Sequence, residues 1–407
     1  MQGFRQDRAA SRAGAAAGHG PRWGARHLKT VGGRLWQGAA FALVAVLALQ
    51  GCGTSQGHKN PPKSKASSTS KTEVQYVTGP LPALAAVEFP TASLGFLGGQ
   101  GAVLMSQDGG AQWTRIYQGP QSITALDFLS ANQGYALTSQ GELMAWSSQG
   151  GWSQIAADVP PIVAMGPAGS VPSELLTSQG DLFHRAGGQG PWQKESLGGV
   201  IAMSFTDPQN GFAVTGGAAT APELWQTADG GSTWQALYTP KLGTAQGWSA
   251  ALGASGSDVW LLLTNASGQV EHQPYVAYVS QDGGQHFQEA LGAALFAGQG
   301  LYPAAPNALY GLQAGPFAVS GPSAYFLSWQ PGTPQDVLAL SVTADAGQSF
   351  SQRTLAGVNH ALTPAFFQPL SLTIAPGGTL WLVGSRSGAG TVLFSSDGGV
   401  SWQTPAF

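Results

Sequence analysis

The octamer Ser106-Gln107-Asp108-Gly109-Gly110-Ala111-Gln112-Trp113 decides the fold, because it recurs along the chain. Copies lie at 227–234, 280–287 and 395–402, with a looser copy at 343–350. An Asp that hydrogen-bonds the backbone two residues on, followed by glycines that accept positive φ, favours a tight turn. Each octamer therefore predicts a hairpin tip between two strands, anchored by a buried ring. The residues with this structural role are Asp108, Trp113, Asp229, Trp234, Asp282, Phe287, Asp345, Phe350, Asp397 and Trp402.

The composition favours many short strands joined by tight turns. Only 9% of the 407 residues are charged and 59 are Gly, whereas roughly 25% of residues are charged in typical soluble domains. No long stretch has the apolar spacing of a helix, so we expect an all-β protein.

The charge is distributed unevenly. Residues 1–51 carry seven Lys/Arg and one acid, whereas residues 73–407 carry six Lys/Arg against 19 Asp/Glu, a formal charge of −13. A body this acidic repels phosphates, so we do not expect nucleic-acid binding.

The first 51 residues resemble a lipoprotein signal peptide. A basic segment precedes a 12-residue apolar run at 38–49, which is shorter than a membrane span needs, and Leu49-Gln50-Gly51-Cys52 follows it. This tetrapeptide resembles a bacterial lipobox, and Cys52 is the only cysteine in the chain. We expect lipidation at Cys52, anchorage to the outer face of the bacterial cell membrane, and no disulfide. An uncleaved N-terminal anchor is the alternative.

Residues 52–79 are expected to form a flexible polar tether. The segment 53–72 has four Lys, no acid and almost no apolar residue, so it cannot build a core.

From residue 80 the chain is organised in repeating units. Each unit has an expected second strand marked by an apolar residue, then a turn and an aromatic anchor, and units of this length are typical of a β-propeller. The second-strand markers are Phe96, Tyr135, Leu176, Phe212, Trp260, Tyr310 and Trp381. We predict a seven-bladed β-propeller of four-stranded antiparallel blades at 80–407, with six blades as the alternative. The last blade is expected to end on a fourth strand at 403–407, and 74–78 to pair along an edge.

The octamer resembles the Asp-box, or BNR repeat, which occurs in sialidases, sortilin-type receptors and the photosystem II stability/assembly factor family. The whole repeating region is most similar to this last family. The resemblance implies a membrane-associated propeller that binds protein assembly intermediates, partly through an arginine-rich patch. This chain has only four Arg after residue 72, so a photosynthetic role is not carried over.

Long intervals between markers predict long loops on the face opposite the Asp-containing turns, around the fifth to seventh blades. Loops on a rigid scaffold often bind ligands, and aromatic side chains there suggest a platform for a peptide or a sugar. Packing of these rings onto the propeller is the alternative. The candidate ligand-binding residues are Glu271, His272, Tyr275, Phe317, Tyr325, Phe326, Trp329, His360, Phe366 and Phe367.

The sequence favours a binding protein over an enzyme. A sialidase needs three converging arginines, but Arg115, Arg185 and Arg353 lie on or beside outer strands. The alternative function is a glycoside hydrolase with a carboxylate pair. We expect no cofactor and no metal, a monomer, and a protein or cell-envelope polymer as partner. The sparse charge also predicts tolerance of acid.

Overall fold

The computed structural model describes residues 76–407 except 156–157, 218–219, 243–246, 266–272, 294–306, 310–312, 331–336, 356–366 and 387. The predicted signal peptide, Cys52 and most of the predicted tether lie outside the described residues. All regular elements among the described residues are strands, apart from one short 3-10 helix, η1 (Ala186–Gly188), which confirms the all-β prediction. The described part of the chain contains no helix long and apolar enough to cross a membrane.

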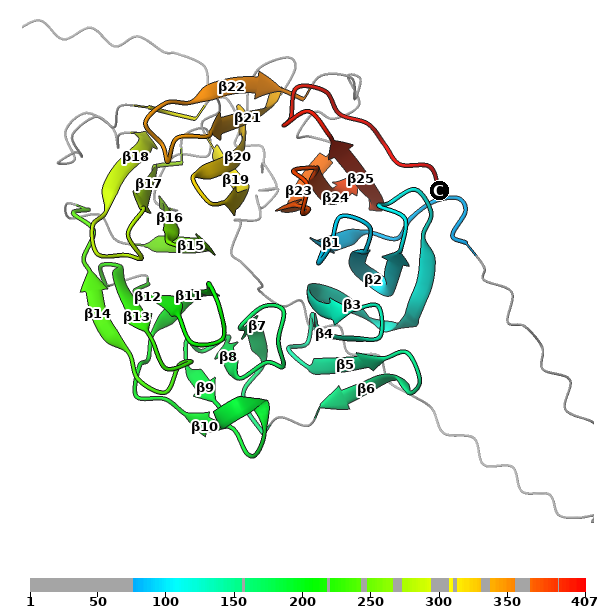
Figure 1. Ribbon diagram of the computed structural model, residues 1–407, viewed down its shortest axis with the longest axis horizontal. Helices are drawn as coiled ribbons and strands as arrows, with labels where there is room; N and C mark the ends of the chain where they lie inside the picture. The colour runs from blue at the N-terminus through cyan, green and yellow to red at the C-terminus, as the bar shows by residue number, and fades with distance from the viewer. Residues whose placement is uncertain are drawn as a thin grey trace, which may run out of the picture. The chain divides into compact units, whose positions relative to one another are not determined.

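The strands form a β-propeller of six antiparallel sheets arranged around a ring (Figure 1). The first sheet contains β1 (Leu84–Glu88), β2 (Gly95–Ser106), β3 (Thr114–Ser130), β4 (Gln133–Thr138), β5 (Leu143–Ser147) and β6 (Gly151–Ile155). The second contains β7 (Ile162–Gly166), β8 (Glu174–Thr177), β9 (Leu182–His184) and β10 (Gln193–Lys194). The third contains β11 (Val200–Phe205), β12 (Gly211–Thr215), β13 (Glu223–Thr227) and β14 (Gln235–Tyr238).

The remaining sheets follow in chain order. The fourth contains β15 (Trp248–Ser255), β16 (Asp258–Asn265), β17 (Tyr275–Ser280) and β18 (Gln288–Ala293). The fifth contains β19 (Gln313–Ser320), β20 (Ser323–Gln330), β21 (Val337–Thr343) and β22 (Ser351–Thr354). The sixth contains β23 (Phe367–Ile374), β24 (Leu380–Arg386) and β25 (Ala389–Ser395).

The prediction of seven separate four-stranded blades is wrong, because the strands form six sheets. The 17-residue strand β3 pairs with β2 in its first half and with β4 in its second half. It therefore joins the first two predicted units into one six-stranded sheet. Counting one aromatic anchor per blade could not detect a strand that continues through the expected break.

The prediction of a fourth strand at the C-terminus is also wrong. Gln403 makes only an isolated bridge to Phe394, so the sixth sheet has three strands. Near the start of the described residues, Tyr76 forms an isolated bridge with Thr114 at an outer edge of the first sheet.

Apolar contact between the first and last sheets closes the ring. Phe89 follows β1 and stacks on Trp381 of β24 with a centroid distance of 4.5 Å. Trp113 packs edge-on against Trp381 and is 1% exposed. Pro82 also forms an isolated bridge with Ala389, where β25 begins. Each sheet thus buries faces that only its neighbours cover, as expected for a propeller.

Candidate functional site

Six of the ten candidate ligand-binding residues have no described side chain. Glu271, His272, His360 and Phe366 lie outside the described residues, and Trp329 and Phe367 are placed on β20 and β23 by backbone only. The binding role predicted for these residues stays a prediction.

The other four candidates lie on strands, so their predicted placement in loops is wrong. Phe317 on β19 stacks on Phe326 of β20, with ring centroids 5.2 Å apart. Phe326 is 1% exposed, and Tyr325 packs against the apolar cluster of the fifth and sixth sheets. Tyr275 on β17 is 2% exposed and its hydroxyl accepts a hydrogen bond from the Leu309 amide at 2.8 Å. These four rings pack the propeller core.

The error has a definite source. The sequence marker Tyr310 lies outside the described residues, and β20 with Phe326 is the second strand of the fifth sheet. The long interval before Asp345 therefore contains three complete strands, β19, β20 and β21, where the prediction allowed for the rest of a second strand, an inserted loop and a third strand.

The repeated octamers form turns with one shared hydrogen-bond pattern, and we call them the Asp turns (106–113, 227–234, 280–287, 343–350 and 395–402). In the first, the Ser106 hydroxyl donates to the Asp108 carboxylate at 2.8 Å and accepts from the Gly110 amide at 2.8 Å. Asp108 accepts from the amide of Gln112, four residues on, at 2.9 Å. The predicted bond two residues on is therefore replaced by one that spans the whole turn. The Trp113 indole donates to the Gly110 carbonyl at 3.0 Å, which confirms the ring as an anchor.

Hydrogen bonding keeps the Asp turns charged. Side-chain bonds from Thr233 and backbone bonds lower the pKa of Asp229, and the same kinds of donor lower the pKa of Asp345 to about 2. For Asp108, burial is the largest single effect and acts to raise the pKa, but the hydrogen bonds from Gln112, Ser106 and Ala111 together outweigh it and lower the pKa. These carboxylates are ionised at neutral pH, and the hydrogen bonds that they accept come from residues of the same turn.

A second group of carboxylates lies between neighbouring inner segments. Glu88 at the end of β1 accepts from the Phe128 amide at 3.0 Å, and Asp127 accepts from the Gly169 amide at 2.7 Å. Burial, and then the nearby Asp127, raise the pKa of Glu88 to about 8. Burial raises the pKa of Asp127 to about 6. Glu88 thus links β1 to β3, Asp127 links β3 to the turn between β7 and β8, and both hold their protons more tightly than free carboxyls.

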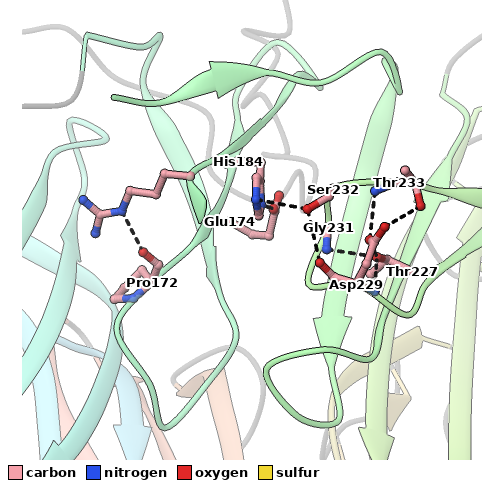
Figure 2. A network of polar contacts seen from close by, with 9 residues as sticks. Pro172, Glu174, His184, Thr227, Asp229, Gly231, Ser232 and Thr233 are labelled. Carbon is pink, nitrogen blue, oxygen red and sulfur yellow. Dashed lines mark hydrogen bonds and ion pairs between the residues drawn. The ribbon is translucent and has the colours of Figure 1, made fainter. Parts of the chain in front are cut away.

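The third buried acid belongs to a network between the second and third sheets (Figure 2). Glu174 on β8 faces His184 on the paired strand β9, and its carboxyl oxygen Oε1 bonds the His184 Nδ1. His184 Nε2 lies 3.3 Å from the Ser232 hydroxyl, in the Asp turn of the third sheet. Ser232 in turn donates to the Asp229 carbonyl at 3.2 Å.

The order acid, histidine and serine is that of a nucleophilic triad, but the proton positions oppose this function. Glu174 is fully buried, and burial, then Glu195 and Asp229, raise its pKa to about 9. Burial lowers the pKa of His184. Both pKa shifts favour a pair of neutral side chains in which the protonated Glu174 donates to Nδ1 of His184. His184 Nε2 then carries a proton and donates to Ser232, so it cannot act as the base that would activate this hydroxyl.

A small pocket lies where the β4–β5 turn meets β6 and the start of β7. It has a volume of about 180 Å³ and is lined by Gln140, Glu142, Gln154, Ile155 and Ile162 among others. The Glu142 carboxylate accepts hydrogen bonds from the side-chain amide of Gln154 at 3.1 Å and from the side-chain amide of Gln121 on β3. The sequence analysis missed this site, because only the fold brings β3, β6 and the β4–β5 turn together.

Within the described ranges, no group of three or more His, Cys, Asp or Glu side chains is placed to hold a metal ion. The ligand-binding candidates Glu271 and His272 lie outside those ranges.

Comparison with known proteins shows the fold but no family. No protein-family model and no curated protein matches the chain. A solved structure of YCF48 bound to D1 peptide superposes with a TM-score of 0.51 at 14% identity, covering 78% of this chain and 95% of the other. At this identity the similarity supports a β-propeller and nothing finer.

Two further structures are similar at lower scores. YCF48 from Cyanidioschyzon merolae matches with a TM-score of 0.48 at 12% identity, covering 78% of this chain and 97% of that one. The BP39L lectin from Burkholderia pseudomallei matches with a TM-score of 0.49 at 14% identity, covering 80% of this chain and 99% of the lectin.

Proposed function

We propose that this chain is a non-enzymatic scaffold that binds a protein partner presenting a basic surface. The observation that carries the proposal is the charge of the propeller region, in which 19 Asp/Glu oppose six Lys/Arg at residues 73–407. The lowered pKa values of the Asp turns keep their share of this charge ionised at neutral pH. Such a field accelerates encounter with a cationic partner and disfavours an anionic one.

The fold supports a protein partner by analogy. The propeller of YCF48 has been solved with D1 peptide bound, and this chain shares that fold. A closed ring of sheets is also rigid, so its surface loops can present a fixed binding face. The resemblance of the Asp turns to Asp-box repeats, and of the region to assembly factors, is part of the same proposal.

The absence of catalysis is part of the proposal as well. In the polar network with triad-like order, the raised pKa of Glu174 and the lowered pKa of His184 favour His184 Nε2 as the donor to Ser232, which suits a link between sheets better than nucleophilic attack.

The experiment is an array of synthetic peptides of matched length that are basic, neutral or acidic, probed with the whole chain. We expect binding to the basic peptides only, with affinity falling steeply as salt rises from about 50 to about 500 mM because exposed charges are screened. Binding that ignores peptide charge would refute the proposal. A panel of chromogenic glycosides tests the hydrolase alternative, which gains support if turnover occurs and a carboxylate substitution abolishes it.

We also propose that the scaffold is anchored outside the cytoplasm by a lipid on Cys52. The support is the lipobox-like Leu49-Gln50-Gly51-Cys52 and the absence of any other cysteine from the sequence. In a bacterial host, we expect labelled palmitate to be incorporated and the chain to sediment with membranes. Cys52→Ala should abolish the label, and a chain that is labelled equally without Cys52 would disprove the anchor.

A further inference from the structure

We propose that the pocket around Glu142, which we call the Glu142 pocket, binds the side chain of a lysine presented by the partner. The inference rests on the proposed scaffold function and specifies the chemistry of one contact. Its polar lining residues are Gln140 and Glu142 in the β4–β5 turn and Gln154 on β6, and Gln121 on β3 lies beside the pocket and hydrogen-bonds Glu142.

The first argument is the charge of the pocket. The described ion pairs join His184 to Glu174, Lys194 to Asp181 and His286 to Asp282, so none of them involves Glu142. The described partners of its carboxylate are neutral: the amides of Gln121 and Gln154, and the Thr138 hydroxyl at 3.5 Å. A carboxylate oxygen has two acceptor positions, so these bonds leave Glu142 able to accept from a cation.

The second argument is the direction of the surrounding amides. A carboxylate only accepts, so Gln121 and Gln154 must turn their NH₂ groups toward Glu142. The Gln121 side-chain amide also donates to the side-chain oxygen of Gln140 at 3.1 Å. The carbonyl oxygens of Gln121 and Gln154 then remain as acceptors beside the carboxylate. A group with several donors and a positive charge, such as an ammonium, matches this arrangement.

The third argument is the shape and the wall. The apolar lining of the pocket of about 180 Å³ consists of the half-buried Ile155 and Val159, with the buried Leu143 and Ile162 behind them. An alkyl chain that ends in a charged head buries its methylene groups on such a wall while its head reaches the acceptors. A lysine side chain has this form, and its charge complements the acidic propeller region.

In the test, Nα-acetyl-lysine amide is the probe and the whole chain is the receptor. Binding is measured by NMR titration. The matched probe is Nα-acetyl-6-hydroxynorleucine amide, which keeps the alkyl chain and replaces the ammonium by a hydroxyl. We expect saturable binding of the lysine probe with a Kd on the order of millimolar. The hydroxyl probe should bind at least about tenfold more weakly, because a charge-assisted bond is lost.

Two variants locate the binding. Glu142→Gln should weaken binding of the lysine probe by about tenfold or more. Glu223 on β13 is a half-buried acid outside the pocket, so Glu223→Gln should leave the affinity for the lysine probe unchanged. Equal binding of the two probes, or unchanged binding by Glu142→Gln, would overturn the assignment. The same variants on the peptide array separate the two proposals. Failure of the wild type to bind any basic peptide refutes the scaffold, whereas retained binding by Glu142→Gln refutes only the pocket.

Discussion

The Asp turns and the buried inter-strand acids use the same functional group in opposite ways. Asp229 is exposed, accepts several hydrogen bonds and has a lowered pKa, so it works as a charged acceptor. Glu174, which contacts that same turn through His184, is fully buried with a raised pKa, so it works as a neutral acid. Donor supply and solvent access, not residue type, decide the proton state of each carboxyl.

The largest expected effect of this contrast is on the pH dependence of stability. Folded-state pKa values of about 8 for Glu88, 6 for Asp127 and 9 for Glu174 all exceed the unfolded values of 4.5 or 3.8. Their stabilising contribution is complete below the unfolded pKa and is lost as pH rises through the folded pKa. We expect the free energy of unfolding to fall by several kcal/mol from about pH 4.5 to about pH 9, since each unit by which a folded-state pKa is raised is worth about 1.4 kcal/mol at most.

Two other groups shape the acidic side of this profile. The lowered pKa of His184 opposes the gain below its unfolded value of 6.5. The Asp turns lose their contribution only as pH falls from 3.8 through their lowered pKa values, which for Asp345 means about 2. Urea unfolding followed by Trp fluorescence at pH 3, 4.5, 6, 7.5 and 9 measures the curve. A stability that increases from pH 4.5 to pH 8 would contradict the neutral state of the buried acids.

The next largest effect concerns the place where the two groups meet. Gly231 in the third-sheet Asp turn has φ +98°, and a Cβ there would lie 2.0 Å from the Glu174 carboxyl oxygen Oε1. We expect Gly231→Ala to lower the free energy of unfolding by about 3 kcal/mol, through backbone strain and overpacking. Urea unfolding at pH 7 is the measurement.

Gly283 is the control, since it has φ +71° but a Cβ at this position would meet no other atom within 4 Å. Gly283→Ala should therefore cost only the left-handed backbone strain, about 1 kcal/mol. If both variants lowered the free energy of unfolding by the same amount, Glu174 would not pack against this turn.

A smaller effect tests the hydrogen bonds inside one Asp turn. Ser106 is 1% exposed, and its hydroxyl accepts from the buried Gly110 amide. Ser106→Ala leaves that amide without a partner, so we expect a loss of about 2 kcal/mol in urea unfolding. Gln107 is exposed on the same turn, and Gln107→Ala should stay within about 0.5 kcal/mol of wild type. A Ser106→Ala variant as stable as the Gln107 control would refute the role of the hydroxyl.

The sequence predicted the parts of this structure that depend on local chemistry. Turn glycines, the Asp and its aromatic anchor are specified within eight residues, and Trp113 and Trp402 are buried as expected. Second-strand residues such as Phe212 and Trp260 were also placed correctly, because a buried strand centre needs a large apolar side chain.

The parts that depend on distant pairing were not predictable. Whether β3 continues between two units depends on partners on both sides, β2 and β4, which no local pattern reveals. The Glu142 pocket and the contact of Glu174 with a turn 48 residues beyond His184 likewise arise only from the fold.

The smallest expected effect is the sharpest test of the contrast, because it reverses the usual expectation about burial. Gln keeps the size of a protonated Glu and can donate to His184 Nδ1, so Glu174→Gln should cost only about 0.5 kcal/mol at pH 7. Asp229→Asn should cost more, about 1 kcal/mol, although Asp229 is exposed, because Asn lacks the second acceptor oxygen that takes the Thr233 hydroxyl.

A change of pH then separates the two variants further. Above the pKa of about 9, wild-type Glu174 must ionise without water or stay protonated at a cost. At pH 10 we therefore expect Glu174→Gln to be more stable than wild type in urea, whereas Asp229→Asn keeps its deficit because Asp229 is ionised at both pH values. If Glu174→Gln lost several kcal/mol at pH 7, Glu174 would be a buried anion that accepts from the Nδ1 proton of a neutral His184, and Nε2 would be free to accept from Ser232. The proton in the network would then point the other way, which would reopen the case for Ser232 as a nucleophile.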